Sequence, residues 1–389
     1  MLIYLDNAAT TAVDPRVAAK MMRCLSEDGV YGNAASISHA YGAAARIKIE
    51  EARAQVAGVV GCDVDEIVWT SGATEADNLA VFGVAQYYQG NGRHLVTSRT
   101  EHKAILDPCR ELERRGWSVT YLSPDDRGLL TPQSVAAAIR PDTVLVSIMH
   151  VNNEIGVIQD IEAIAAACNA HGKPLHVDAA QSVGKVRLDL RSAGIALASL
   201  SAHKAHGPKG VGALAINKRH AAGRHPVQLQ PLLYGGGQER GLRSGTLPTH
   251  QIVGMGAAFE LAEAERAGDS ARIAGLRDRL WEALSGAGAA LRNGDPAICV
   301  PHILNVSFED VEGESLLAGV RDRIAVSTGS ACTSATEEPS YVLRALGRGE
   351  RLAESSLRFS MGRFTSTSDI DLAAEVVTQA LRRLRRIAC

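Results

Sequence analysis

A single cysteine, Cys332, stands in a run of small and hydroxyl-bearing residues, SACTSA, at positions 330–335. Between residues 326 and 340 the only bulky aliphatic or aromatic side chain is that of Val326, so this run has little with which to anchor itself in a core. We therefore expect it to form an exposed loop. A thiol in such a loop is poorly suited to packing, and well suited to accepting a group from a bound substrate.

Lys204 ends the motif SAHK at residues 201–204, which follows an apolar stretch and precedes two glycines, Gly207 and Gly210. A lysine amine at the end of a buried strand is a candidate for a Schiff base with a carbonyl cofactor. Lys204 and Cys332 together suggest an enzyme in which a cofactor loosens a bond and a cysteine collects the product.

A candidate phosphate site lies in the motif TSGATE at residues 70–75, which follows an apolar run and opens a helical pattern. Small residues such as Ala73 leave backbone N–H groups free, and the helix dipole favours an anion there. The hydroxyl groups of Ser71 and Thr74 can add donors. An ordinary helix cap is the alternative interpretation.

Two more candidates follow expected strands. Asp178 comes after the apolar run 174–177, and a carboxylate at the carboxyl end of a parallel strand faces the usual ligand crevice, where it can pair with a protonated ring nitrogen. His102 follows the run 94–98, and its imidazole can stack on a planar ring and move protons near neutral pH. The alternatives are a helix cap for Asp178 and a structural histidine for His102.

Asn153 and Arg358 are candidates for binding a substrate. Asn153 follows the run 144–149, and its amide can donate to a ring oxygen or to a carboxylate. Arg358 lies in the alternating run SLRFS, which turns it away from Leu357 and Phe359, and a guanidinium can hold a carboxylate through two parallel hydrogen bonds. The alternatives are a turn residue for Asn153 and a structural ion pair for Arg358.

Short apolar runs that alternate with helical patterns must position these residues. Such alternation predicts an α/β fold with a mostly parallel, seven-stranded sheet covered by helices on both faces. The expected strands span residues 66–70, 94–98, 119–122, 144–149, 174–177, 198–201 and 212–216. Expected helices include residues 17–25, 47–60, 133–139 and 161–170.

From about residue 253 the pattern changes and predicts a smaller α+β domain. We expect the N-terminal segment to complete this domain in space, so the predicted division is a large domain at 16–257 and a small domain made of 1–15 and 258–389. The final helix is amphipathic, with Ser368 or Asp369 as its cap. The expected elements are helices 255–265, 273–285 and 368–386 and strands 303–308, 324–327 and 357–360.

Composition narrows the class of protein. The 389 residues are 46% hydrophobic, enough for two domain cores, and the net charge of −2 favours neither nucleic acid nor an anionic membrane as a partner. We find no apolar stretch long enough to span a membrane and no signal-peptide pattern. The seven cysteines show no C-x-x-C spacing, so we expect reduced thiols, no metal site and a cytoplasmic protein.

Taken together, these motifs resemble the NifS/IscS-type cysteine desulfurases, which are transferases of fold type I that depend on pyridoxal 5'-phosphate (PLP). The resemblance runs from YLDNAATT at residues 4–11 to about residue 386. The long cysteine loop is similar to that of the IscS-like branch. The matching motifs are SGATE (71–75), TEHK (100–103), MHVNNE (149–154), SAHK (201–204), RSGT (243–246) and SACTS (330–334).

The resemblance implies PLP as the cofactor and L-cysteine as the substrate. It implies that Lys204 forms the Schiff base and later moves the Cα proton, and that His102 stacks on the ring as acid and base. Cys332 would attack the substrate sulfur, leave alanine and carry a persulfide. In the cofactor, the resemblance implies that Asp178 contacts the ring nitrogen and Gln181 the ring oxygen. Ala73 and Asn153 would also contact the cofactor, and its phosphate would be bound by Thr74, Ser201 and His203, with Thr246 reaching the phosphate in a partner subunit. The substrate would be bound by Asn33, Asn153 and Arg358.

The implied partners are a second copy of the chain, in a homodimer, and a sulfur-acceptor protein. The acceptor would be an iron–sulfur scaffold or a protein of tRNA or DNA thio-modification. Two departures from the family stand out: Ala202 where a glycine is common, and an end at Cys389 where IscS-like proteins continue with a segment that docks the scaffold. The choice of acceptor therefore stays open.

Three alternatives remain. An aminotransferase or β-lyase would share Lys204 and Asp178, but gives no reason for Cys332. A selenocysteine lyase needs the same ring chemistry. A non-catalytic sulfur-relay scaffold has no need for Lys204, His102 and Asp178 together.

Overall fold

The computed structural model describes residues 2–220, 226–328 and 339–388, and its central element is a seven-stranded sheet ordered β2-β8-β7-β6-β5-β3-β4. The strands from β7 to β4 run parallel, whereas β8 is antiparallel to both of its neighbours. The predicted mostly parallel α/β sheet is therefore confirmed. The strands are β2 (Ile67–Thr70), β3 (His94–Ser98), β4 (Ser118–Leu122), β5 (Thr143–Ser147), β6 (Leu175–Asp178), β7 (Leu197–Ser201) and β8 (Gly212–Ile216).

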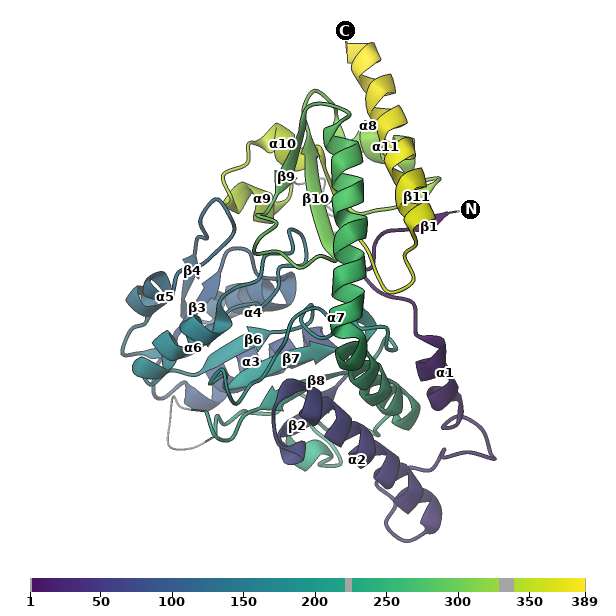
Figure 1. The fold of residues 1–389 in the computed structure, drawn as a ribbon. Helices are drawn as coiled ribbons and strands as arrows, with labels where there is room; N and C mark the ends of the chain where they lie inside the picture. Colours follow the sequence, from purple (N-terminus) through teal and green to yellow (C-terminus); the bar gives the residue numbers. More distant parts are fainter. Residues whose placement is uncertain (1, 221–225, 329–338, 389) are drawn as a thin grey trace.

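Helices cover both faces of this sheet, because successive side chains of each strand point to opposite sides. In β2, Ile67 and Trp69 enter a core shared with α2, α5, α6 and α7 (Thr249–Ser285), whereas Val68 enters a second core shared with α3 and α4. Figure 1 shows the sheet between these helical layers. The helices are α1 (Pro15–Met22), α2 (Ala40–Val60), α3 (Ala73–Tyr88), α4 (Lys103–Arg114), α5 (Pro132–Ala138) and α6 (Ile161–Ala170).

A second group of elements packs at the other end of the molecule (Figure 1). Its strands form an antiparallel sheet ordered β12-β10-β9 and a parallel pair of β1 with β11. Ile3 and Leu5 of the N-terminal segment enter the core of this group. The elements are β1 (Ile3–Tyr4), β9 (Ala290–Asn293), β10 (Ile303–Phe308), α8 (Gly313–Val320), β11 (Ile324–Ala325), α9 (Tyr341–Ala345), α10 (Glu350–Glu354), β12 (Ser356–Ser360) and α11 (Thr367–Ala388).

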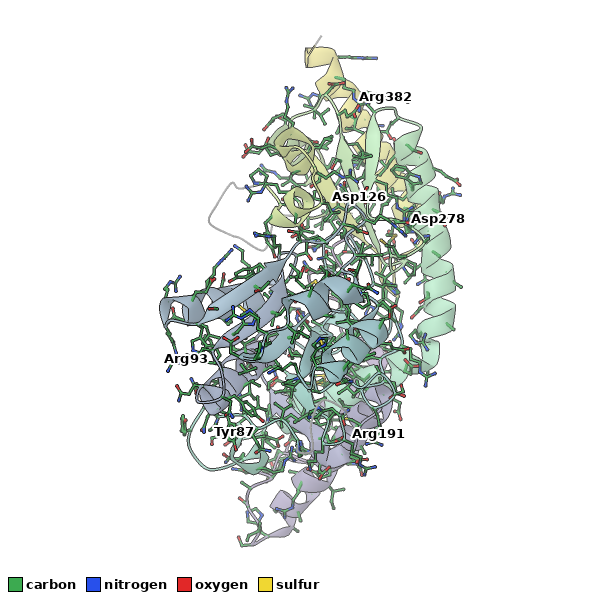
Figure 2. All side chains as sticks on the ribbon, turned by 90° about the vertical axis from the view of Figure 1, so that its left-hand side faces the viewer. Tyr87, Arg93, Asp126, Arg191, Asp278 and Arg382 are labelled. Atoms are coloured by element: carbon green, nitrogen blue, oxygen red, sulfur yellow. The ribbon has the colours of Figure 1, made fainter. Side chains whose placement is uncertain are left out.

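The prediction of two helices at 255–265 and 273–285 is wrong, because one helix, α7 (Thr249–Ser285), runs through both. Gly268 and Ser270 resemble a break in the sequence, but a glycine costs a helix only about 1 kcal/mol. Burial of both halves in different cores, together with the ion pair from Asp269 to Arg363, outweighs that cost. In Figure 2, where Asp278 is labelled, α7 forms one edge of the molecule.

The N-cap predicted for α11 also needs correction. The helix begins at Thr367, and Ser366 caps it: its Oγ accepts from the backbone N–H of Asp369, whose carboxylate accepts from the backbone N–H of Ser366. This reciprocal pair is a capping box, which satisfies two orphan donors at once.

The proposed domain boundaries stay a prediction, since α7 passes through residue 257 without interruption. None of the helices described is long and apolar enough to cross a bilayer.

Candidate active site

A pocket of about 540 Å³ opens at the carboxyl ends of β6 and β7, next to the N-terminus of α3. This volume is in the range of small-molecule and cofactor sites. The pocket brings together most of the residues singled out from the sequence: Ala73, Thr74, His102, Asn153, Asp178, Gln181, Ser201, His203, Lys204 and Arg358.

Two predicted residues do not line the pocket. Asn33 lies in an exposed loop, where its side chain accepts from the backbone N–H of Ala35. Thr246 is exposed in the loop that precedes α7. Cys332 lies outside the described residues.

One end of the pocket is suited to an anion. Gly72 is the N-cap of α3 and has no side chain to satisfy the first N–H groups, so those of Ala73 and Thr74 meet the pocket. The buried hydroxyl of Ser201 is without a hydrogen-bond partner among the described residues. Gly212 lets β8 approach closely, because a Cβ there would lie 2.6 Å from the backbone of Gly72.

The glycine-rich loop that follows β8 is fastened to the same end. Arg243 pairs with Glu75 at 2.9 Å, and Glu75 also accepts from the backbone N–H of Ser71. Burial alone would raise the pKa of Glu75, but the hydrogen bonds from Arg243 and Ser71 outweigh burial and lower this pKa. Earlier in the same loop, Glu239 forms a buried ion pair with Arg53 of α2 at 2.7 Å. The loop is thus tied to the helix that opens the pocket.

At the opposite end, Asp178 is buried with 6% of its surface exposed, and it accepts from the backbone N–H of Ala180. Burial raises the pKa of Asp178, while the nearby His102 and Lys204 lower it. A cationic group in the pocket would stabilise the carboxylate further.

Two buried carboxyl groups that the sequence analysis did not assign lie close to Asp178. Asp77 stands on the buried face of α3, where its Oδ1 is 3.6 Å from Nε2 of His176. Glu101 accepts from the backbone N–H of Met149. Burial, together with the charge of Asp178, raises the pKa of both carboxyls. An aspartate within the apolar stripe of a helix was the available signal for Asp77.

Asp77 makes stability depend on pH in a defined direction. The unfolded chain loses this proton near the usual aspartate pKa of about 4, whereas the folded chain keeps it to higher pH. Above that pH the folded state binds more protons, so the free energy of unfolding falls as pH rises. We expect Asp77→Asn, which mimics the protonated acid, to remove up to about 1.4 kcal/mol per pH unit of this fall.

Urea unfolding of the cofactor-free protein between pH 5 and 8 measures this slope. The exposed Asp126, labelled in Figure 2, supplies the control variant Asp126→Asn, which should keep the parent slope. If the free energy of unfolding of Asp77→Asn falls with pH as steeply as that of the parent protein, Asp77 is ionised in the folded chain.

His102 is held in one tautomer. It is the N-cap of α4, and its Nδ1 accepts from the backbone N–H of Ala104 at 3.1 Å. An acceptor nitrogen carries no hydrogen, so a neutral His102 has its proton on Nε2. Burial lowers the pKa of His102, and the neighbouring Lys204 lowers it further although Asp178 opposes the shift. The pocket is therefore lined by a neutral imidazole with one N–H.

Lys204 ends the short helix η2 (Ala202–Lys204) directly after β7. Its Nζ donates to the backbone oxygen of Ala8 at 2.5 Å. Ala8 belongs to the N-terminal segment, which makes a second contact with the same turn: the backbone N–H of Thr11 donates to the backbone oxygen of His203. The amine is thus presented to the pocket by two segments that are far apart in the chain.

Arg358 in β12 forms a structural ion pair and also lines the pocket, so both interpretations of this residue apply. Its Nη2 pairs with Asp6 at 2.7 Å, and its Nη1 donates to the backbone oxygen of Asn153 at 2.9 Å. The guanidinium is nevertheless part of the pocket wall, and its buried Nε is without a hydrogen-bond partner among the described residues. A carboxylate that enters the pocket therefore meets a cation held in a fixed orientation.

Comparison with known proteins gives a consistent result. The family model for class-V aminotransferases matches residues 3–372. The cysteine desulfurase IscS of Pseudomonas aeruginosa is 55% identical over 386 residues, which cover 99% of this chain and 94% of that protein. The cysteine desulfurase IscS of Aeromonas hydrophila has the same identity and coverage.

Solved structures agree with this similarity. A NifS-like protein superimposes with a TM-score of 0.90 at 36% identity, covering 99% of this chain and all of that one. DndA of Streptomyces lividans is 44% identical with a TM-score of 0.78, over 92% of this chain and 99% of the other. SspA in complex with cysteine is 37% identical with a TM-score of 0.81, over 94% of this chain and all of that one.

Proposed function

This chain belongs to the class-V aminotransferase family as a PLP-dependent cysteine desulfurase, and from this premise we propose that the pocket described above takes the sulfur from L-cysteine and leaves L-alanine. The observation that carries the proposal is the meeting of Lys204, Asp178 and His102 around one cavity. SspA, a structural relative, is described in complex with cysteine, which supports the choice of substrate.

The residues present fit PLP. The N-terminus of α3 and the hydroxyl of Ser201, which has no hydrogen-bond partner in the described part of the chain, offer donors to a phosphate. At the other end, Asp178 offers a carboxylate to a pyridine nitrogen, and Lys204 offers an amine to an aldehyde. We assign Ala73, Thr74, Asn153, Gln181 and His203 to the same cofactor site. Bound there, PLP supplies an electron sink that weakens bonds of an amino-acid substrate.

The chain's own residues then divide the work. Lys204 holds the cofactor through Nζ and later carries the proton from the substrate Cα. His102 offers a flat, neutral imidazole that moves a proton through Nε2. Arg358 holds the substrate carboxylate, with Asn153 beside it, and we add Asn33 from the loop outside the pocket.

Cys332 completes the reaction in this proposal. Its thiolate attacks the sulfur of the substrate, an S–S bond forms, and the C–S bond breaks with its electron pair left on the substrate carbon. That carbon takes a proton and becomes the methyl group of alanine. Atoms and electrons balance without an outside oxidant, since the sulfur leaves as sulfane sulfur while the carbon is reduced.

The test is direct. Purified protein loaded with PLP should show visible absorbance and convert L-cysteine to equimolar alanine and persulfide sulfur. A colourless protein that binds no PLP would support a scaffold without catalysis. Equal turnover of selenocysteine with no persulfide on the protein would support a selenocysteine lyase.

We propose a homodimer in which Thr246 of each subunit reaches the phosphate in the other. Both residues that miss the pocket, Asn33 and Thr246, lie in loops that also carry exposed apolar side chains. Ile37 is 83% exposed and Tyr234 is 77% exposed. Exposed apolar side chains on functional loops are typical of an interface.

We expect Thr246→Ala to release PLP about tenfold faster, because it removes a hydrogen bond to a charged group. The free energy of unfolding of the cofactor-free protein should not change. PLP release after dilution, followed by absorbance, measures the effect. Thr367→Ala, at another exposed threonine, is the control. A fully active monomer by light scattering would contradict the shared site.

We also propose a cytoplasmic location and transfer of the sulfur to an acceptor protein. An iron–sulfur scaffold and a protein of tRNA or DNA thio-modification remain the two kinds of acceptor. To distinguish them, proteins from a native extract that become linked to this protein through a disulfide or persulfide bond are captured, released by reduction and identified.

A further inference from the structure

Behind the pocket, Lys185 touches two of the residues assigned to PLP. It lies in the turn that follows β6, four residues after Gln181. Its Nζ donates to Oε1 of Gln181 at 2.7 Å and to the backbone oxygen of Lys204 at 3.4 Å. The sequence analysis gave Lys185 no role.

The contact with Lys185 decides which way the Gln181 amide faces. In its ammonium form Lys185 only donates hydrogen bonds, so this form holds the amide oxygen of Gln181 toward itself. The amide nitrogen then lies on the other side, where Nε2 donates to the backbone oxygen of Ala8 at 2.8 Å. Nε2 carries two hydrogens, and the second remains for a group in the pocket that Gln181 lines.

Ala8 places this donor beside the reactive amine. Its backbone oxygen accepts from both Nε2 of Gln181 and Nζ of Lys204, so the two nitrogens flank one atom. In PLP the ring oxygen stands next to the aldehyde carbon that an amine attacks. A donor next to Lys204 is therefore where the ring oxygen needs one.

We propose that Lys185 is a positioning residue that holds the oxygen of the Gln181 amide and so turns its nitrogen toward the ring oxygen of PLP. The inference rests on the proposed function, because it assumes PLP in this pocket. Lys185 touches neither substrate nor cofactor and acts through Gln181.

A structural ion pair does not explain Lys185. Among the described residues it has no carboxylate within salt-bridge distance, and burial together with the charge of Lys204 lowers the pKa of Lys185 to about 7. The cavity of about 30 Å³ next to it has room for water and nothing larger. The charged and titratable groups around this cavity and amine are Lys204, His203, His206, His302, Asp269 and Arg363.

The test is a double-mutant cycle of Lys185→Met and Gln181→Ala on the full chain. We expect each single variant to weaken PLP binding to the cofactor-free protein about tenfold, the loss of one hydrogen bond to a charged acceptor. The double variant should bind no more weakly than either single one, because Lys185 has no effect without the amide it orients.

A spectroscopic readout separates positioning from loosened packing. A hydrogen-bond donor at the ring oxygen reduces the negative charge that this oxygen offers to the Lys204 nitrogen, and so favours the deprotonated form of that nitrogen. We expect the pH midpoint of the visible band of PLP-loaded protein to rise in both single variants, and no further in the double one. Lys173→Met is the control, since Lys173 is also partly buried and donates to a backbone oxygen, of Pro141, on an outer face.

Each outcome decides the inference. The inference is overturned if the two substitutions weaken PLP binding additively, or if the pH midpoint of the visible band is unchanged in Lys185→Met. In either case, PLP binding by the wild-type protein leaves the proposed function intact. Wild-type protein that binds no PLP would instead overturn the proposed function. Should Lys185→Met not fold, Lys185→Gln replaces it, because a neutral amide both donates and accepts and no longer fixes Gln181.

Discussion

Replacement of Lys204 by alanine should lower alanine formation from cysteine by roughly 10³-fold or more and abolish the visible absorbance of the PLP-loaded protein. The reason is geometric. The Nζ of Lys204 is held at the carboxyl end of β7 by the Ala8 carbonyl, which also accepts from the amide nitrogen of Gln181. In the proposed mechanism, removal of this amine removes both the attachment of the cofactor and the carrier of the Cα proton.

The pocket supplies a matched control for this prediction. Lys209 is the second lysine among the pocket-lining residues, but it is exposed at the rim. Lys209→Ala should keep the visible band, because an exposed amine is free to leave the pocket for solvent. Alanine release at the parent rate by Lys204→Ala would remove Lys204 from the mechanism, and loss of the band in Lys209→Ala would move the assignment to Lys209.

The part of this site that could be predicted from the sequence is the part made by strand ends. β3, β8 and β10 have the bounds expected for them, because strands buried on both faces read as short apolar runs between turns. Lys204 and Asp178 then follow by position, since the carboxyl ends of parallel strands meet at one edge of a sheet. Their convergence in one pocket therefore needed no knowledge of tertiary contacts.

The rest depends on contacts that leave no trace in local sequence. The backbone oxygen that holds Lys204 comes from Ala8, 196 residues away, and a carbonyl has no side-chain signature. Asp77 lines the pocket from α3, and its closeness to Asp178 depends on how α3 packs on the sheet. Lys185 lies behind the pocket, where the turn after β6 brings it to Gln181. β9 (Ala290–Asn293) was missed because it is a half-buried edge strand among glycines, without the apolar run of a central strand.

The second large effect is expected at the cysteine that carries the sulfur, and the burial of five cysteines limits which residue this can be. Burial raises the pKa of Cys62, Cys109, Cys168 and Cys299 to about 12 each, and also raises that of Cys24. A thiol with so high a pKa is almost wholly protonated at neutral pH and is a poor nucleophile. The carrier is therefore sought in the two cysteines outside the described residues, Cys332 and Cys389.

We expect Cys332→Ala to retain PLP and its visible band, because Lys204, Asp178 and Gln181, to which we assign the cofactor, are unchanged. Sulfur release from cysteine should nevertheless fall on the order of 10³-fold or more, since no thiolate remains to form the S–S bond. Mass spectrometry of the parent protein after a cysteine pulse should find the persulfide on Cys332. Cys389→Ala and Cys62→Ala should keep the parent rate. A persulfide on either of those residues in the parent, or unchanged sulfur release by Cys332→Ala, would transfer the carrier role away from Cys332.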